Sequence, residues 1–297
     1  MWTATVGALA ELARLPARGH PSRAGHPLHP VRPGETAGAT AGWVSGTPPI
    51  RAIITSDMKT VTVAERPDLT ELGWALTSDL LPEYNNHGDV LNAYWGRLTE
   101  ERPEFQFHLL GDKDEVLARA RSLPVRWDGS LQDLPTGIDG AIARGFDEGG
   151  ANVLCAMVIM IPRNLQGRGL STVALQAMGE LASRHGFTAL IAPVRPSWKE
   201  RYPLVPIDRY AAWRRPDGSL FDPWMRVHER VGATILKTEP HSLRITGTVA
   251  DWEEWTQMTF LDSGAYWFPG GLATVAIDRD ADSGRYWEPN VWMRHVV

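Results

Sequence analysis

The segment from Gln166 to Ser171 reads Gln-Gly-Arg-Gly-Leu-Ser and lies between an apolar run and an amphipathic stretch. Its two glycines, two positions apart, allow positive φ angles and let a ligand approach the backbone closely. N–H groups at the start of a helix have no intrahelical acceptor and can bind an anion such as a pyrophosphate. The segment therefore predicts a site for a phosphate-bearing ligand, although the hexapeptide alone also fits a simple strand-to-helix turn.

The elements on both sides of this loop support the interpretation as a site. Residues 153–161 are entirely apolar and end at Pro162, which predicts a strand buried on both faces. Apolar residues recur at helical spacing after Ser171, and Gly186 stands where a helix would end. A strand, a glycine loop and the first turn of a helix are thus expected in succession.

The loop does not fit the two best-known phosphate-binding patterns. No Gly-Lys-Ser/Thr follows, which excludes a Walker loop, and Thr172 stands where a dinucleotide fingerprint needs its third glycine. The loop resembles the acetyl-CoA loop of the GNAT superfamily of N-acyltransferases, whose pattern is Gln/Arg-x-x-Gly-x-Gly/Ala. The resemblance implies that acetyl-CoA is bound by the loop and by the backbone at the end of the preceding strand. The implied residues are Met160, Ile161, Gln166, Gly167, Arg168, Gly169, Leu170 and Ser171.

A second segment, residues 221–233, adds to this resemblance. Asp222 and Pro223 are typical of a helix start, and Gly232 of a helix end. Many GNAT enzymes carry a Tyr-Glu-Lys-Leu-Gly-Phe-like segment at this place, and here His228 stands at the position of the tyrosine. The resemblance implies that His228 protonates the leaving thiolate, for which a histidine with a near-neutral pKa is suited. A surface histidine on an amphipathic helix is the alternative interpretation.

The candidate general base comes from the polar loop at residues 81–89, which in this family borders the acceptor site. Glu83 and His87 are the candidates in that loop, and Glu83 is preferred. Asp147 and Glu148, just before the apolar strand, are alternatives, and a chain of water molecules could also remove the proton.

The fold class expected from these patterns is α/β (α+β), with a mixed, mostly antiparallel GNAT-like sheet flanked by helices. Residues 1–57 are rich in Ala, Gly, Pro and Arg and are expected to form a disordered tail. Residues 58–297 are expected to form the acyltransferase domain with a Trp-rich C-terminal extension, since eight of the 13 tryptophans lie between Trp198 and Trp292. The expected elements are helices at 68–81, 90–99, 138–146 and 249–256, a hairpin of 105–110 with 116–123, and strands at 189–193, 273–277 and 291–295.

Composition excludes several classes of function. A net charge of −5 and a pI near 6.0 give no electrostatic support for nucleic-acid binding. No apolar run is long enough to span a membrane, and no cluster of residues predicts a metal site. Cys155 is the single cysteine and lies within the apolar strand, so it is expected to be an inert core residue in a cytoplasmic protein.

The function expected from the resemblance is acetyl transfer from acetyl-CoA to the amine of a small molecule, by direct attack in a ternary complex. The alternative is a GNAT-fold module that senses acyl-CoA without turnover. A protein N-terminus or lysine as acceptor, and a homodimer, are left open.

Overall fold

The computed structural model describes residues 58–297, so the tail expected at residues 1–57 lies outside the described part. Within it, nine strands form one sheet in the order β1-β2-β3-β4-β5-β9-β8-β7, and β6 also pairs with β9. The strands are β1 (Lys59–Thr62), β2 (Gln106–Leu110), β3 (Val116–Val125), β4 (Val153–Met160), β5 (Leu190–Val194), β6 (Thr234–Gly247), β7 (Gly264–Tyr266), β8 (Val275–Asp278) and β9 (Ser283–His295).

The sheet is mixed, as predicted. The pair β4 and β5 is parallel, and every other pairing is antiparallel. The parallel pair is joined through a helix, which is the usual connection between parallel strands. The hairpin of β2 and β3 is confirmed at its predicted place.

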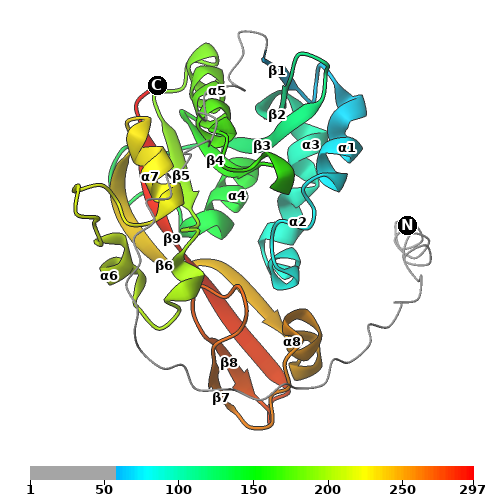
Figure 1. Cartoon of the computed structure of the whole chain (residues 1–297), viewed down its shortest axis with the longest axis vertical. Coiled ribbons are helices and arrows are strands. Elements are labelled where there is room, and N and C mark those ends of the chain that lie inside the picture. Colours follow the sequence, from blue (N-terminus) through cyan, green and yellow to red (C-terminus); the bar gives the residue numbers. More distant parts are fainter. Residues whose placement is uncertain (1–57) are drawn as a thin grey trace, which may run out of the picture. The chain divides into compact units, whose positions relative to one another are not determined.

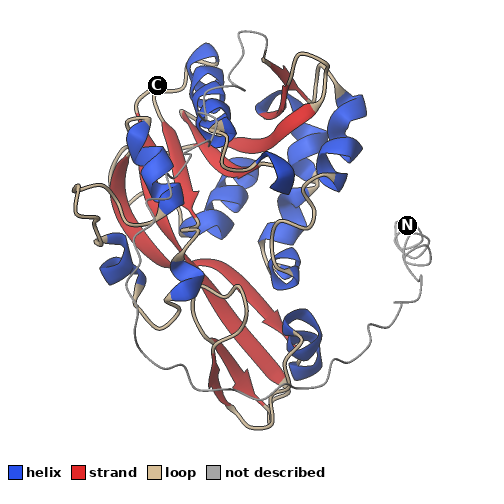
Figure 2. Ribbon diagram, in the orientation of Figure 1, coloured by secondary structure: helices blue, strands red, loops and turns tan. Residues whose placement is uncertain are grey.

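Helices cover both faces of the sheet (Figure 2). One face packs mainly against α5, α6 and α7, and the other against α2, α3 and α4. Along β4 the side chains alternate between these two cores, with Cys155 in one and Leu154 and Ala156 in the other. The α-helices are α1 (Thr70–Ala75), α2 (Leu91–Trp95), α3 (Arg97–Glu101), α4 (Gly137–Asp147), α5 (Leu170–Arg184), α6 (Ile207–Ala211), α7 (Pro223–Arg230) and α8 (Val249–Thr256).

The C-terminal part forms an extension of the sheet. The long strands β6 and β9 run beyond the central sheet to β7, β8 and α8 (Figure 1). Trp252 of α8 is fully buried there, with Phe268 and Tyr286 packed edge-on against it. The strand predicted at 291–295 is therefore only the end of β9, which begins at Ser283.

The first predicted helix, at 68–81, is wrong in its length, and the apolar face expected from the spacing of Leu69, Leu72, Leu76 and Leu80 is only partly buried, since Leu69 alone of the first three is buried. Residues 67–69 form a 3-10 turn, α1 ends at Ala75, and Leu72 and Leu76 are exposed. The residue that α1 buries is Gly73, where an added Cβ would lie 2.4 Å from the His108 ring. The leucine spacing does not select the buried side, because a glycine makes the close contact with the sheet.

None of the helices described in residues 58–297 is both long enough and apolar enough to cross a membrane.

Candidate active site

The glycine loop lies between β4 and α5, as the sequence predicts (Figure 1). Gly167 has φ of 76° and Gly169 has φ of 80°, both in the left-handed region that favours glycine. Gly169 is the N-cap of α5, and the buried side chain of Leu170 anchors the first turn. In the described structure the N–H groups from Gly167 to Ser171 donate to no protein acceptor. Such a row of free donors at a helix N-terminus fits a pyrophosphate.

The side chains of the loop divide into bound and free groups. Gln166 Nε2 donates to the carbonyl oxygen of Ile161 at 3.1 Å and closes the loop. Arg163 is paired with Asp79 at 2.9 Å, whereas Arg168 is exposed and has no pairing partner among the described residues. The Ser171 hydroxyl does not cap the helix. Arg168 is thus the loop cation that remains free for a phosphate.

The strands β4 and β5 separate before the loop is reached. Their pairing covers only Leu154 and Cys155 of β4, so that the strand has no partner on this side from Ala156 to Met160. On the other side β4 carries a bulge, because Arg121 of β3 pairs with Val158 and Ser122 pairs with Ala156. Backbone groups in the opened stretch can therefore hydrogen bond a ligand, consistent with the expected role of Met160 and Ile161.

His228 lies in α7, but its environment differs from the expectation of a near-neutral histidine. The side chain is buried and its Nδ1 lies 2.9 Å from Nε2 of His295 in β9. Burial lowers the pKa of His228 to about 3, with a smaller contribution from His295, so the ring is neutral at pH 7. The near-neutral pKa expected of His228 is therefore wrong, because β9 covers the ring. Its role as proton donor stays a prediction.

Glu83 lies in a 3-10 turn, Glu83–His87, and its side chain is exposed. Its carboxylate contacts His87 Nε2 at 3.2 Å. The next residue, Tyr84, is buried and its hydroxyl accepts a hydrogen bond of 3.0 Å from Arg195, directly after β5. The turn that carries Glu83 is thus fixed beside the end of β5, and the role of Glu83 as base stays a prediction.

From the sequence, Arg195 is expected at an edge of the acceptor site that could bind a carboxylate-bearing amine, but the polar network around it at the end of β5 was not predicted. Arg195 Nε donates to Glu288 Oε1 at 3.0 Å, and Tyr84 donates to the carbonyl oxygen of Gly270 at 2.7 Å. Glu288 is 3% exposed and also faces the hydroxyl of Tyr286. Arg195 is separated from Glu288 by 93 positions and from Tyr84 by 111. No local pattern links residues so distant in the chain.

Two buried arginines on β3 were also missed. Arg119 and Arg121 are 1% and 4% exposed, and neither is paired with a carboxylate in the described structure. The signal was present, because two arginines alternate with alanine and serine inside a buried strand.

Asp139 in α4 is a further buried carboxyl that sequence reasoning did not single out. Its Oδ2 accepts a hydrogen bond from the backbone of Arg244 at 2.8 Å, and its Oδ1 has no partner in the described residues. Burial raises the pKa of Asp139 to about 6, and the nearby charge of Asp89 adds to the effect. The ionised form is therefore disfavoured at this position.

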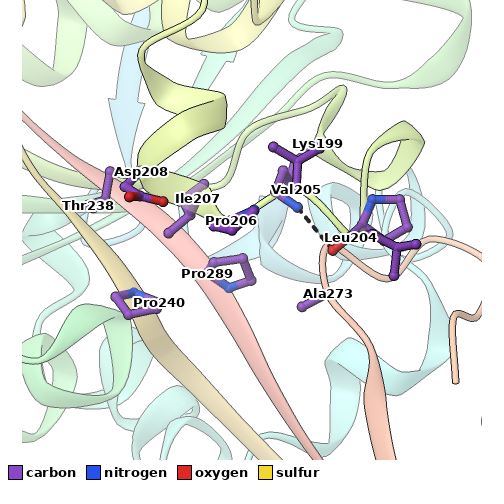
Figure 3. A pocket seen from close by; sticks show the side chains of 11 residues that line it. Lys199, Leu204, Val205, Pro206, Ile207, Asp208, Thr238, Pro240, Ala273 and Pro289 are labelled. Carbon is purple, nitrogen blue, oxygen red and sulfur yellow. Dashed lines mark hydrogen bonds between the residues drawn. The ribbon is translucent and has the colours of Figure 1, made fainter. Parts of the chain in front are cut away.

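A cavity of about 290 Å³ lies elsewhere, between the loop after β5 and the strands β6 and β9 (Figure 3). Lys199, Thr238 and Pro289 line it together with residues 203–208. The Lys199 ammonium donates to the carbonyl oxygens of Tyr202 at 2.8 Å and Leu272 at 2.6 Å. No residue of the glycine loop lines this cavity, so it does not coincide with the predicted acetyl-CoA site.

In the described part of the chain, Cys155 is not placed as a reactive thiol and the acidic residues do not form a metal site. Cys155 is fully buried, and burial raises the pKa of its thiol. Within residues 58–297, no three His, Cys, Asp or Glu side chains are grouped as a metal site would need.

Comparison with known proteins supports the GNAT resemblance. The chain is 28% identical over 271 residues to the arginine N-acetyltransferase AvaD of Aspergillus versicolor, covering 80% of this chain and 93% of the relative. Its structure is similar to the loading GNATL domain of CurA from Lyngbya majuscula, with a TM-score of 0.51, 18% identity, and coverage of 80% and 96% of the two chains. A weaker likeness, with a TM-score of 0.39 and 12% identity, is to a ribosomal-protein-alanine N-acetyltransferase from Brucella melitensis, covering 81% and 99%. No protein-family model matches the chain.

The fold and the similarity to an enzyme over most of both chains agree with the free N–H groups of the glycine loop. The non-catalytic sensor, the alternative considered from the sequence, is not favoured. The fold is that of GNAT acyltransferases, and the similarity over most of both chains to an N-acetyltransferase supports acyl-CoA-dependent N-acetyl transfer, with acetyl-CoA as co-substrate.

Proposed function

We propose that this N-acetyltransferase acts on a small molecule with a primary amine, and that the acceptor is arginine or a close analogue. The observation that carries the proposal is the row of free N–H groups from Gly167 to Ser171, beside the stretch where β4 leaves β5. The choice of arginine as acceptor rests on the similar protein from Aspergillus versicolor, which is named an arginine N-acetyltransferase.

The proposed reaction is a direct transfer. The neutral amine nitrogen forms a bond to the thioester carbonyl carbon, and the bond from that carbon to sulfur breaks. The nitrogen loses a proton and the leaving thiolate gains one, so the products are an N-acetylated amine and CoA. No acyl-enzyme is needed, and the buried thiol of Cys155 is unsuited to form one.

The residues of this chain have distinct roles in the proposal. The loop N–H groups and Arg168 hold the phosphates, and the backbone near Met160 and Ile161 polarises the thioester carbonyl. Glu83 is the candidate general base that receives the amine proton, directly or through water. His228 is the candidate proton donor to the thiolate; burial keeps its pKa at about 3, so the ring is neutral at pH 7 and can give up a proton only as its other nitrogen receives one.

Ligand-dependent thermal unfolding tests the cofactor site. Acetyl-CoA at ~100 times its dissociation constant should stabilise the protein by about 2.7 kcal/mol, and NAD should not. Gly169→Val should abolish the shift by blocking the close approach of the phosphates. Gly218→Val is the matched control, because Gly218 has a similar positive φ of 81° and lies in an exposed turn outside the glycine loop. Both substitutions place a branched side chain at a positive φ angle, so both should lower the stability of the free protein. Only Gly169→Val should also abolish the stabilisation by acetyl-CoA.

Release of CoA in the presence of amines tests the acceptor. Arginine, its amide, agmatine and the other amino acids form the panel, and N-terminal peptides test a protein acceptor. Turnover of free arginine supports the proposal. Turnover of peptides alone would contradict the small-molecule part.

A further inference from the structure

Two arginines of β3 lie on one face of the sheet. Arg119 and Arg121 are two positions apart, and side chains alternate between the faces of a strand. Ala118 and Ala120 pack toward α5, so the arginines lie on the face opposite the helix that begins at the glycine loop. Leu123, next on the arginine face, belongs to the core under α4.

The guanidinium groups are buried with few partners. Arg119 Nη2 approaches the sulfur of Met160 at 3.1 Å, and its guanidinium lies 4.9 Å from the ring centre of Trp74. Neither contact supplies a negative charge. Arg119 Nε and Arg121 Nη1 have no acceptor among the described residues.

No carboxylate compensates these charges in the described structure. Burial lowers the pKa of Arg119 to about 10, and burial together with the charge of Arg119 lowers that of Arg121 to about 10. Across the strand pair, His108 faces Arg119, and burial followed by the two arginine charges lowers its pKa to about 4. Two adjacent buried cations with a neutral histidine are costly unless an anion joins them.

The position of this pair relative to the opened strand suggests which anion it is. Arg119 pairs with Met160 and Arg121 pairs with Val158, and both of these β4 residues lie within the stretch in which β4 has left β5. The arginines therefore lie one strand away from the predicted thioester position, on the side away from α5. A carboxylate on the acceptor could reach them there, whereas the phosphate-binding N–H groups lie at the start of α5.

We propose that Arg119 and Arg121 bind the carboxylate of the acceptor, so that the substrate class is an amino acid rather than a simple amine. The inference rests on the proposed function. A carboxylate accepts two parallel hydrogen bonds from one guanidinium, which fixes its orientation as well as its charge. Binding through the carboxylate would leave the amine directed toward the thioester. A phosphate of CoA is the other anion that the same groups could hold.

Matched acceptor pairs test the substrate class with the full-length protein. Each pair is an amino acid and the amine that lacks its carboxylate: arginine with agmatine, lysine with cadaverine, and tyrosine with tyramine. A preference for the amino acid by about 10- to 100-fold in kcat/KM supports the inference. Equal rates for both members of every pair would overturn it and leave the acetyltransferase function intact. No turnover of any amine would instead overturn the proposed function.

Substitutions of Arg121 then test whether the preference for the amino acid over the decarboxylated amine depends on this arginine. Arg121→Met should raise KM for the amino acid about 10- to 100-fold, leave KM for the decarboxylated amine unchanged, and leave the unfolding temperature equal or higher. Arg121→Lys should restore part of the preference. Arg126→Met is the control, because Arg126 is an exposed arginine just beyond β3 with its own carboxylate partners.

Two results of the variants would overturn the inference. A rise in KM for acetyl-CoA with either acceptor would assign the arginines to a CoA phosphate. A lowered unfolding temperature with an unchanged acceptor preference would assign them to the fold alone.

Discussion

Arg195 Nε and Glu288 Oε1 lie 3.0 Å apart and join the end of β5 to the middle of β9. Tyr84 completes the contact from the turn before α2, since its hydroxyl accepts from Arg195 and lies 3.2 Å from Glu288. Burial alone would lower the pKa of Arg195, but the carboxylate of Glu288 raises it. This network holds the end of β5 at a fixed place, and β5 forms one side of the opening beside β4.

Removing the charge of Glu288 should destabilise the protein strongly. Glu288→Gln leaves the Arg195 guanidinium, whose side chain is 23% exposed, without its counter-charge. We expect a loss of about 3 kcal/mol in the free energy of unfolding, measured with urea. Glu148→Gln removes one partner of the exposed pair with Arg126 and should cost less than about 1 kcal/mol. Equal losses in both variants would contradict the structural importance of the Arg195 contact.

Stability should fall on acidification below pH 6.5 because of the histidine pair. The pKa of His228 is lowered to about 3 and that of His295 to about 4 by burial, while an unfolded histidine titrates near 6.5. The unfolded state thus binds more protons between these values, and the histidine contribution to stability is lost as pH falls. We expect a loss of about 2 kcal/mol for one such histidine from pH 7 to pH 5.

Substitution of single histidines identifies which residue causes this dependence of the unfolding free energy on pH. His228→Gln should flatten the dependence of the unfolding free energy on pH. His241→Gln changes an exposed histidine and should leave the dependence as it is. If both variants keep the parent slope, His228 is not the group that titrates.

Asp139 should make the protein less stable as pH rises, which is opposite to the effect of the histidine pair. Its pKa is raised from 3.8 to about 6, so the folded state resists ionisation and stability falls as pH rises through this range. Asp139→Asn keeps an acceptor for the Arg244 N–H and removes the buried charge. We expect the variant to be more stable than the parent by about 3 kcal/mol at pH 7, and by less than about 1 kcal/mol at pH 4.

The neighbouring carboxylate, Asp89, is ion-paired and serves as the control for Asp139. Asp89→Asn breaks the ion pair of 2.7 Å with Arg244 and should destabilise the protein at pH 7. A loss of stability in Asp139→Asn as well would show that the Asp139 charge is needed in the folded state.

Arg168 and Arg163 should differ in their effect on acetyl-CoA. Arg168 is exposed and free, whereas Arg163 is held by Asp79. Arg168→Gln should raise KM for acetyl-CoA several-fold at low salt with little change in kcat, and the effect should shrink as ionic strength rises. Arg163→Gln is the matched control with a smaller effect. The assignment of Arg168 to a phosphate fails if the two variants have the same KM.

The amino-acid sequence by itself determined the elements that depend on neighbouring residues. The apolar run of β4, the glycine loop and α5 follow from period, backbone freedom and helix ends. Asp222 caps α7 and Thr248 caps α8 as local hydrogen-bond chemistry requires. The glycine loop and the segment at 221–233 also carried the GNAT resemblance and hence the expected reaction.

Only the tertiary structure decided the environment of the site. It covers His228 with β9 and so removes the proton-donor pKa that the sequence suggested. It also leaves Arg119 and Arg121 buried without a counter-charge, and it places Glu288 beside Arg195. The physical reason is that burial and charge pairing depend on strands far apart in the chain, whereas periodicity and caps depend on residues within a few positions.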